Sequence, residues 1–156
     1  MRIMLTGAIG QVGWELQRTL MPLGHVVTFT HKTLDLANPD RIRNQVREVK
    51  PDLIVNAAAY TAVDQAESEP ELAMAVNGVA PGILAEEAKR MGAGLIHYST
   101  DYVFDGAKNT PYVETDAPNP MNVYGRTKLA GENAVISIGG EYLIFRTSWV
   151  YGLRGK

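Results

Sequence analysis

Short runs of apolar and β-branched residues alternate along this chain with longer segments of helical periodicity. We expect strands over Arg2–Thr6, His25–Thr30, Asp52–Asn56, Gly94–Ser99 and Tyr142–Thr147. Helical spacing of apolar residues predicts helices over 11–21, 39–49, 71–91 and 123–135, the third interrupted near Pro81-Gly82 because proline lacks an amide donor. Strand–helix alternation with near-continuous apolar strands predicts an α/β fold, a doubly wound parallel sheet with helices on both faces.

The composition excludes several classes of function. A chain of 156 residues, 46% apolar and 21% charged, suffices for one domain with a hydrophobic core. The net charge of −2, without a basic run, argues against nucleic acid or a membrane as partner. Cysteine is absent, which excludes disulfides and thiolate chemistry. The start at Met1–Leu5 is too short for a signal-peptide core, and no apolar run reaches membrane-spanning length, so we expect a cytoplasmic protein.

Three glycines follow the first expected strand and open the first expected helix. Gly7, Gly10 and Gly13 have the spacing G-x-x-G-x-x-G, a dinucleotide-binding variant typical of the short-chain dehydrogenase superfamily. Glycine permits the tight turn and a close approach of phosphates, while the helix N-terminus supplies partial positive charge. The alternative is a turn with three convenient glycines, but the position between strand and helix favours a cofactor site. We therefore predict a Rossmann-type domain in which this loop, with Gln11 and Val12, binds NADP (NADPH) or NAD (NADH).

The end of the second expected strand bears on the choice between these cofactors. An acidic residue usually ends this strand in NAD-preferring sites, whereas the stretch Phe29–Lys32 contains none. Lys32, with His31, is expected to face a 2′-phosphate, which modestly favours NADPH. A solvated loop lysine is the alternative.

Two further stretches are expected beside the cofactor. Asp35 and Leu36 lie where related enzymes place an aspartate near the adenine ring. Ala57, Ala58 and Ala59 follow the third expected strand, and their small side chains leave room for a cofactor near the backbone. Tight helix packing would equally explain these alanines.

A tyrosine and a lysine share one face of the last expected helix. Tyr124 and Lys128 lie four residues apart, and Ser99-Thr100-Asp101 ends a central strand at the edge where such sheets bind ligands. A lone Tyr-x-x-x-Lys is more often a surface pair. Combined with a hydroxyl at the sheet edge, it is suited to carbonyl reduction. Tyr124 would donate a proton to the developing alkoxide, its pKa lowered from about 10 by the lysine cation, and Thr100 would hold the carbonyl oxygen.

Four separated motifs make the chain similar to the dTDP-4-dehydrorhamnose reductases throughout its length. They are NAAAYTAVD at 56–64, HYSTDYVF at 97–104, NVYGRTKLAGE at 122–132 and FRTSWVYG at 145–152. The resemblance implies hydride transfer from NADPH or NADH to C4 of dTDP-4-dehydro-L-rhamnose, which gives dTDP-L-rhamnose. The nucleotide sugar would be the small-molecule partner.

The same resemblance implies roles for individual residues. Thr100, Tyr124 and Lys128 would form the catalytic triad, and Lys128 would also bond the nicotinamide ribose. Asn77 matches an asparagine that helps complete a proton relay behind the lysine, with a helix cap as the alternative.

Substrate contacts are implied for a second group of residues, Asp101, Tyr102 and Trp149. For the two aromatic side chains, burial in the core is the competing interpretation. Some family members form a magnesium-assisted homodimer through acidic residues, and Glu15 matches one ligand. One carboxylate is no metal site, so we predict no metal ligands in this chain and leave a homodimer open.

Two other functions share this fold. A sugar-nucleotide 4,6-dehydratase resembles the chain around Ser99–Asp101 but continues with a glutamate, where this chain has Tyr102. An NADP-binding regulatory subunit, like that of methionine adenosyltransferase, need not turn over a sugar. The family is nearly twice this length, so we expect residues 1–156 to form one NAD(P)-binding domain without the substrate lobe. We expect the isolated chain to keep most of the cofactor site and to be impaired in turnover.

Overall fold

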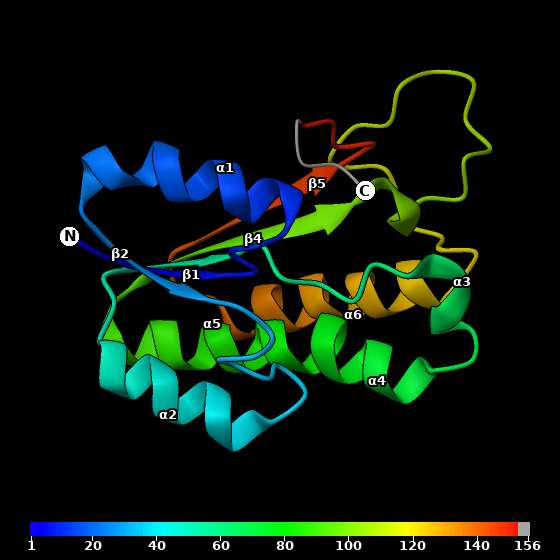
Figure 1. The fold of residues 1–156 in the computed structure, drawn as a ribbon. Coiled ribbons are helices and arrows are strands. Elements are labelled where there is room, and N and C mark those ends of the chain that lie inside the picture. The colour runs from blue at the N-terminus through cyan, green and yellow to red at the C-terminus, as the bar shows by residue number, and fades with distance from the viewer. Residues whose placement is uncertain (153–156) are drawn as a thin grey trace.

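The computed structural model describes residues 1–152, and its centre is a parallel sheet of five strands (Figure 1). The strands lie in the order β2-β1-β3-β4-β5, and every neighbouring pair is parallel. Their bounds are β1 Arg2–Thr6, β2 His25–Phe29, β3 Leu53–Asn56, β4 Gly94–Thr100 and β5 Tyr142–Thr147. The expected strands are confirmed, and each bound differs by no more than one residue.

Helices cover both faces of the sheet, so the doubly wound α/β fold is confirmed. Helix α1 lies on one face, and α2, α5 and α6 lie on the other (Figure 1). The helices are α1 Gln11–Leu20, α2 Pro39–Val49, α3 Val63–Ala66, α4 Pro70–Met74, α5 Ala80–Met91 and α6 Val123–Ile138. Short 3₁₀ turns follow at Met21–Leu23 and Asp101–Val103. Within residues 1–152, none of the helices has the length and apolar character needed to span a bilayer.

The core consists of two clusters, one on each face of the sheet. Side chains alternate between faces along a strand, so Ile3 and Leu5 pack on the α1 side while Met4 packs on the other. Met4 shares its cluster with Ile42 of α2 and Leu84 of α5. All of these side chains are fully buried, which explains why the strands are apolar at nearly every position.

The third expected helix is interrupted, as predicted, but the break precedes Pro81. Residues Ala75–Val79 form a π-helical segment between α4 and α5, and Pro81 lies in the first turn of α5. A proline in this position removes the amide that would bond the carbonyl four residues earlier. The backbone irregularity therefore appears in the preceding turn, where Asn77 is buried.

A buried carboxylate on α5 joins this helix to α2. Glu87 is 2% exposed and accepts hydrogen bonds from Arg47 of α2 at 2.7 and 3.0 Å and from Arg90 at 2.5 Å. Arg43 of α2 adds an ion pair at 3.5 Å. The hydrogen bond from Arg47 is the largest of several effects that lower the pKa of Glu87.

Replacing Glu87 by glutamine is expected to lower the free energy of unfolding at pH 7 by about 2 kcal/mol, because buried hydrogen bonds lose their charge. The folded pKa is lowered, so this stabilisation is present above the unfolded pKa of about 4.3 and is lost as the pH falls through the folded value. The difference between variant and wild type should therefore shrink below about pH 4. Urea denaturation at neutral and acid pH measures it. The control is Glu86→Gln, where an exposed pair with Arg43 should contribute less than about 1 kcal/mol. Equal losses in the two variants would contradict this account.

Candidate functional site

The carboxyl ends of the strands open into a cleft of about 700 Å³. Thr6 at the end of β1, Phe29 at the end of β2 and Thr147 at the end of β5 all line it. The chain runs from β1 outward to β2 and then returns past β1 to β3, so the winding direction reverses between β1 and β3. Open α/β sheets bind ligands at this switch point.

The glycine loop forms one wall of the cleft. Gly7 has a φ of +70°, and a Cβ there would lie 2.6 Å from the Ala58 nitrogen. A Cβ at Gly13 would lie 2.1 Å from the Gly7 carbonyl oxygen. Gly10 precedes α1 without a side-chain cap, so the first amides of the helix keep their bonding capacity beside the cleft. The loop has the shape and polarity that suit a phosphate.

Most of the residues predicted to bind a cofactor line this cleft: Gly7, Gly10, Gln11, Val12, His31, Asp35, Leu36, Ala57, Ala58 and Ala59. Gly13 is not a lining residue and instead packs against the backbone of Gly7. Lys32 is exposed and is also not among the lining residues, whereas its neighbour His31 is. The structure therefore brings His31, rather than Lys32, to the cleft.

Asn77 lies behind the cleft and not in its wall. Its Oδ1 accepts from the Tyr60 amide at 2.8 Å, and its Nδ2 donates to the Tyr60 carbonyl at 3.0 Å and to Thr127 Oγ1 at 3.2 Å. The helix-cap interpretation is wrong, because Asn77 lies within the π-helical segment. These bonds tie the segment after β3 to α6 at the residue before Lys128. None of them reaches the Lys128 ammonium.

The three predicted catalytic residues converge on the cleft. Thr100 ends β4, and Tyr124 and Lys128 lie on successive turns of α6. The start of α6 is held by Asn122 Oδ1, which accepts from the Gly125 amide at 2.7 Å, and by Glu67 Oε1, which accepts from the Val123 amide at 2.7 Å. These caps place Tyr124 in the first turn of the helix, beside the end of β4.

The protonation states of this group differ in part from expectation. Burial raises the pKa of Tyr124, although a hydrogen bond with Thr100 acts in the opposite direction. The predicted lowering of the Tyr124 pKa by the lysine is therefore wrong for this structure. Lys128 is 1% exposed, and its Nζ donates to the Tyr98 carbonyl at 2.6 Å. Burial lowers the Lys128 pKa to about 8. Tyr124 is thus a neutral phenol at neutral pH, the state able to donate a proton.

The residues predicted to contact a substrate all line the cleft. Asp101 accepts hydrogen bonds from Thr100 Oγ1 at 3.2 Å and from Ser148 Oγ at 2.7 Å. Tyr102 is 37% exposed and its ring meets that of Tyr124 edge-on at 5.5 Å. Trp149 is 75% exposed. Burial in the core, the competing interpretation, is therefore wrong for both aromatic residues.

Sequence analysis missed other lining residues: Thr6, Ile9, Phe29, Thr30, Leu34, Thr61, Val63, Val76, Tyr98, Ser99, Thr147 and Val150. Several of them end strands or directly follow them, so the carboxyl-edge rule applied to every strand would have found that part of the group. The others come from loops and helices, and their sequence carries no separate signal.

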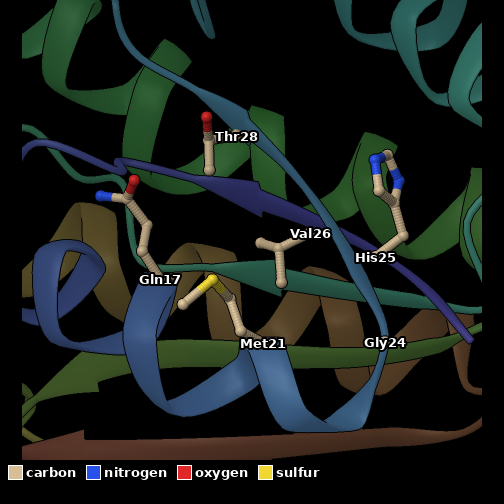
Figure 2. Close-up of a pocket in the computed structure, with 6 residues that line it drawn as sticks. All are labelled: Gln17, Met21, Gly24, His25, Val26 and Thr28. Atoms are coloured by element: carbon tan, nitrogen blue, oxygen red, sulfur yellow. The ribbon is translucent and has the colours of Figure 1, made fainter.

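A second, smaller hollow of about 340 Å³ lies between α1 and β2 (Figure 2). Its lining has a single ionisable side chain, His25, beside Gln17, Met21, Gly24, Val26 and Thr28. These lining residues include no set of side chains suited to catalysis.

Glu15, the residue that matches a metal ligand of some relatives, pairs with Arg18 at 2.5 Å. Residues 1–152 include no group of three or more His, Cys, Asp or Glu side chains placed to hold a metal.

Comparison with known proteins identifies relatives over the whole chain. The profile of the RmlD substrate binding domain family matches residues 1–156. The dTDP-4-dehydrorhamnose reductases of Burkholderia thailandensis and Escherichia coli K12 are 55% and 54% identical to the chain. Both alignments cover 100% of this chain but 52% and 54% of the relatives. The chain thus spans about half the length of the curated relatives it matches.

Solved structures show the same arrangement of elements. The dTDP-4-dehydrorhamnose reductase of Bacillus anthracis, crystallised in complex with NADP, superposes with a TM-score of 0.94 at 42% identity. That alignment covers 99% of this chain and 56% of the other. The UDP-glucose 4-epimerase of Thermus thermophilus, in complex with NAD, has a TM-score of 0.89 at 23% identity, covering 100% and 58%. The latter likeness concerns the fold alone.

Proposed function

Since the chain belongs to the RmlD substrate binding domain family, we propose that its cleft binds NADPH or NADH for the reduction of dTDP-4-dehydro-L-rhamnose to dTDP-L-rhamnose. The observation that carries the proposal is the convergence of Thr100, Tyr124 and Lys128 on the cleft that the glycine loop borders. The named activity of the relatives, and the NADP in the Bacillus anthracis structure, support the choice of substrate and cofactor.

The residues present fit a dinucleotide. A Cβ at Gly7 would collide with the backbone of Ala57 and Ala58, so glycine lets the loop pack directly against the segment after β3, and both stretches line the cleft. The Gln11 side chain, at the first position of α1, has a buried Oε1 that finds no hydrogen-bond partner among residues 1–152. A cofactor hydroxyl would satisfy this oxygen, because buried acceptors in proteins are normally bonded.

The chemistry assigned to the protein's own residues is proton donation and charge stabilisation. NADPH, when bound, supplies the hydride for the ketone carbon. Tyr124 donates its phenolic proton to the ketone oxygen, which becomes the C4 hydroxyl of the product, while Thr100 bonds the same oxygen. The Lys128 cation then stabilises the phenolate left on Tyr124. Asp101, Tyr102 and Trp149 are proposed to hold the sugar in the cleft.

Reduction suits the site better than elimination of water. A dehydratase would need a base near the sugar ring, and the residue after Asp101 is Tyr102 rather than glutamate. Incubation with dTDP-glucose should therefore yield no 4-keto-6-deoxy sugar. Formation of that product would replace the reductase proposal with a dehydratase.

Calorimetric titration of the purified chain with NADPH and with NADH tests the proposal. We expect saturable binding of at least one cofactor. Its oxidation on addition of dTDP-4-dehydro-L-rhamnose should be much slower than in a full-length relative, because the chain spans about half the length of its relatives and a ketone held without the substrate lobe is poorly oriented. Absence of binding by a chain shown to be folded would refute the proposed cofactor site. Co-purification with a synthetase, together with binding but no turnover by a full-length relative, would instead favour an NADP-binding regulatory role.

Alanine substitution of His31 and of Lys32, one at a time, tests which residue sets the preference for NADPH over NADH. His31→Ala is expected to weaken NADPH binding by about tenfold and NADH binding much less, because one charge-assisted bond to the 2′-phosphate is lost. Lys32→Ala is the matched control and should have a smaller effect, since Lys32 is not a lining residue. The ratio of the two affinities in each variant is the measurement. A larger effect at Lys32 would reverse this assignment.

A further inference from the structure

An ion pair with a buried carboxylate lies one helical turn after the predicted catalytic lysine. Glu132 is 1% exposed and lies one helical turn after Lys128 on α6. Arg146 of β5 binds its carboxylate through Nε at 3.0 Å and Nη2 at 2.6 Å. Ser99 of β4 donates a further hydrogen bond from Oγ to Oε1 of the same carboxylate. Neither the glycine loop nor the proposed proton transfer requires this assembly.

We propose that Glu132 is a positioning residue that keeps Lys128 in its charged form, and that Arg146 and Ser99 hold the carboxylate in place for this purpose. The charge effect itself is a property of the folded chain. Its consequence for reduction rests on the proposed function, because only there does the lysine cation act on Tyr124.

The position of Lys128 explains why it needs such support. Its side chain is almost fully buried, and its Nζ donates to the neutral carbonyl of Tyr98. Within residues 1–152, its ammonium forms no direct ion pair with a carboxylate. Burial disfavours the charged form of a lysine, and a carboxylate one helical turn away acts in the opposite direction. Burial has the larger effect on the pKa of Lys128 and lowers it, whereas the charge of Glu132 raises it.

Other ionisable groups around α6 do not replace Glu132. His97 of β4 is buried and its Nδ1 meets Asn56 Nδ2 at 3.1 Å; burial lowers the pKa of His97 to about 3, so the ring is neutral. Tyr124 is a neutral phenol, and Tyr98 of β4 has its pKa raised by burial. Several groups on the packed elements are engaged elsewhere: Asp101 with Ser148, Glu67 with the Val123 amide, Lys89 with the Ile138 carbonyl and Glu87 with arginines. Asp64 of α3, Glu71 of α4 and Arg126 of α6 are exposed to solvent.

The arginine that holds Glu132 is itself fixed. Its guanidinium carbon lies 4.9 Å from the centroid of the Phe104 ring, and Phe104 stacks on Tyr112 at 4.2 Å. A guanidinium between an aromatic face and a carboxylate loses little freedom on forming two parallel hydrogen bonds. The Glu132 carboxylate is therefore held in a fixed orientation, one helical turn after Lys128, although it is buried.

The test is the pKa of Lys128 in the intact chain, measured by NMR titration of its labelled ε-methylene group. In Glu132→Gln we expect this pKa to fall by about one unit or more, because burial remains and the opposing charge is gone. An unfolded chain would give the opposite sign, a rise toward about 10.4. The matched control is Glu48→Gln, an exposed carboxylate on α2, which should leave the Lys128 pKa unchanged.

A second variant guards against misfolding of the first. Replacing Glu132 and Arg146 together by methionine removes the pair without leaving a buried charge, a change that proteins often tolerate well. The Lys128 pKa should fall in this variant also, but by less than in Glu132→Gln, because the Arg146 cation is removed together with the carboxylate. An unchanged pKa in either folded variant would overturn the proposal, since a purely structural role of the pair predicts that result.

The consequence for reduction can be followed separately. Because its Lys128 pKa is lowered, the Glu132→Gln variant should be active near pH 6 and lose activity as the pH rises to 8. The wild type should lose less activity between pH 6 and pH 8. If the wild-type chain binds no NADPH, the proposed function fails, but the lysine titration still stands or falls alone. A fall in the Lys128 pKa without the altered pH profile would show that Glu132 acts on the lysine charge but that this charge does not control the rate of reduction.

Discussion

Replacement of Tyr124 by phenylalanine is expected to lower the rate of keto-sugar reduction by about 10³-fold, the usual effect of losing a positioned general acid. The Tyr124 phenol is neutral at neutral pH because burial raises its pKa, so it can donate a proton in the cleft. Phenylalanine keeps the ring, which packs edge-on against Tyr102, so the first turn of α6 should keep its structure. The loss should therefore appear in turnover and not in folding.

The measurement combines two assays on the same preparation. Oxidation of NADPH with dTDP-4-dehydro-L-rhamnose reports turnover, and calorimetric titration reports cofactor affinity, which should remain nearly unchanged. Tyr142→Phe, at the exposed start of β5, is the matched control and should leave both unchanged. Undiminished turnover in the Tyr124 variant would remove tyrosine from the proposed mechanism.

The second large effect is expected at the glycine loop. Gly7→Ala should abolish measurable NADPH binding and destabilise the fold, because its Cβ would lie 2.6 Å from the Ala58 nitrogen and 2.7 Å from the Ala57 carbonyl oxygen. These two backbone atoms directly follow the buried strand β3 and cannot easily shift, so the glycine loop must move to relieve the collision. A displaced loop would no longer direct its amides at a phosphate.

Gly92→Ala provides an unusually close control. Gly92 has a φ of +69°, against +70° for Gly7, but a Cβ there would meet nothing within 4 Å. Both variants incur the strain of a left-handed residue with a side chain, about 1 kcal/mol. Only the Gly7 variant adds a collision in the cleft. Denaturant unfolding and NADPH titration of the two variants separate these effects, and equal loss of binding would show that strain alone is responsible.

Much of the fold follows from patterns that are local in the sequence. The apolar strands, the helix start at Pro39 and the interruption before Pro81 depend on residues a few positions apart, and the structure has all of them. The carboxyl ends of parallel strands meet at one edge of the sheet, so the strand positions already predict that Thr100 and the glycine loop border one cleft. Spacing on one helix face places Tyr124 and Lys128 together in the same way.

Local sequence patterns did not predict which side chains around the cleft contact one another, or their protonation states. The bond from Lys128 to the Tyr98 carbonyl, the attachment of Asn77 to Tyr60 and the pair of Glu132 with Arg146 join residues 30, 17 and 14 positions apart. No local periodicity specifies which of these side chains meet. Their pKa values depend on burial, and burial is produced by packing of elements that are distant along the chain. The pattern of residues thus predicts which groups reach the cleft, whereas their charge and partners arise when the sheet and α6 close around them.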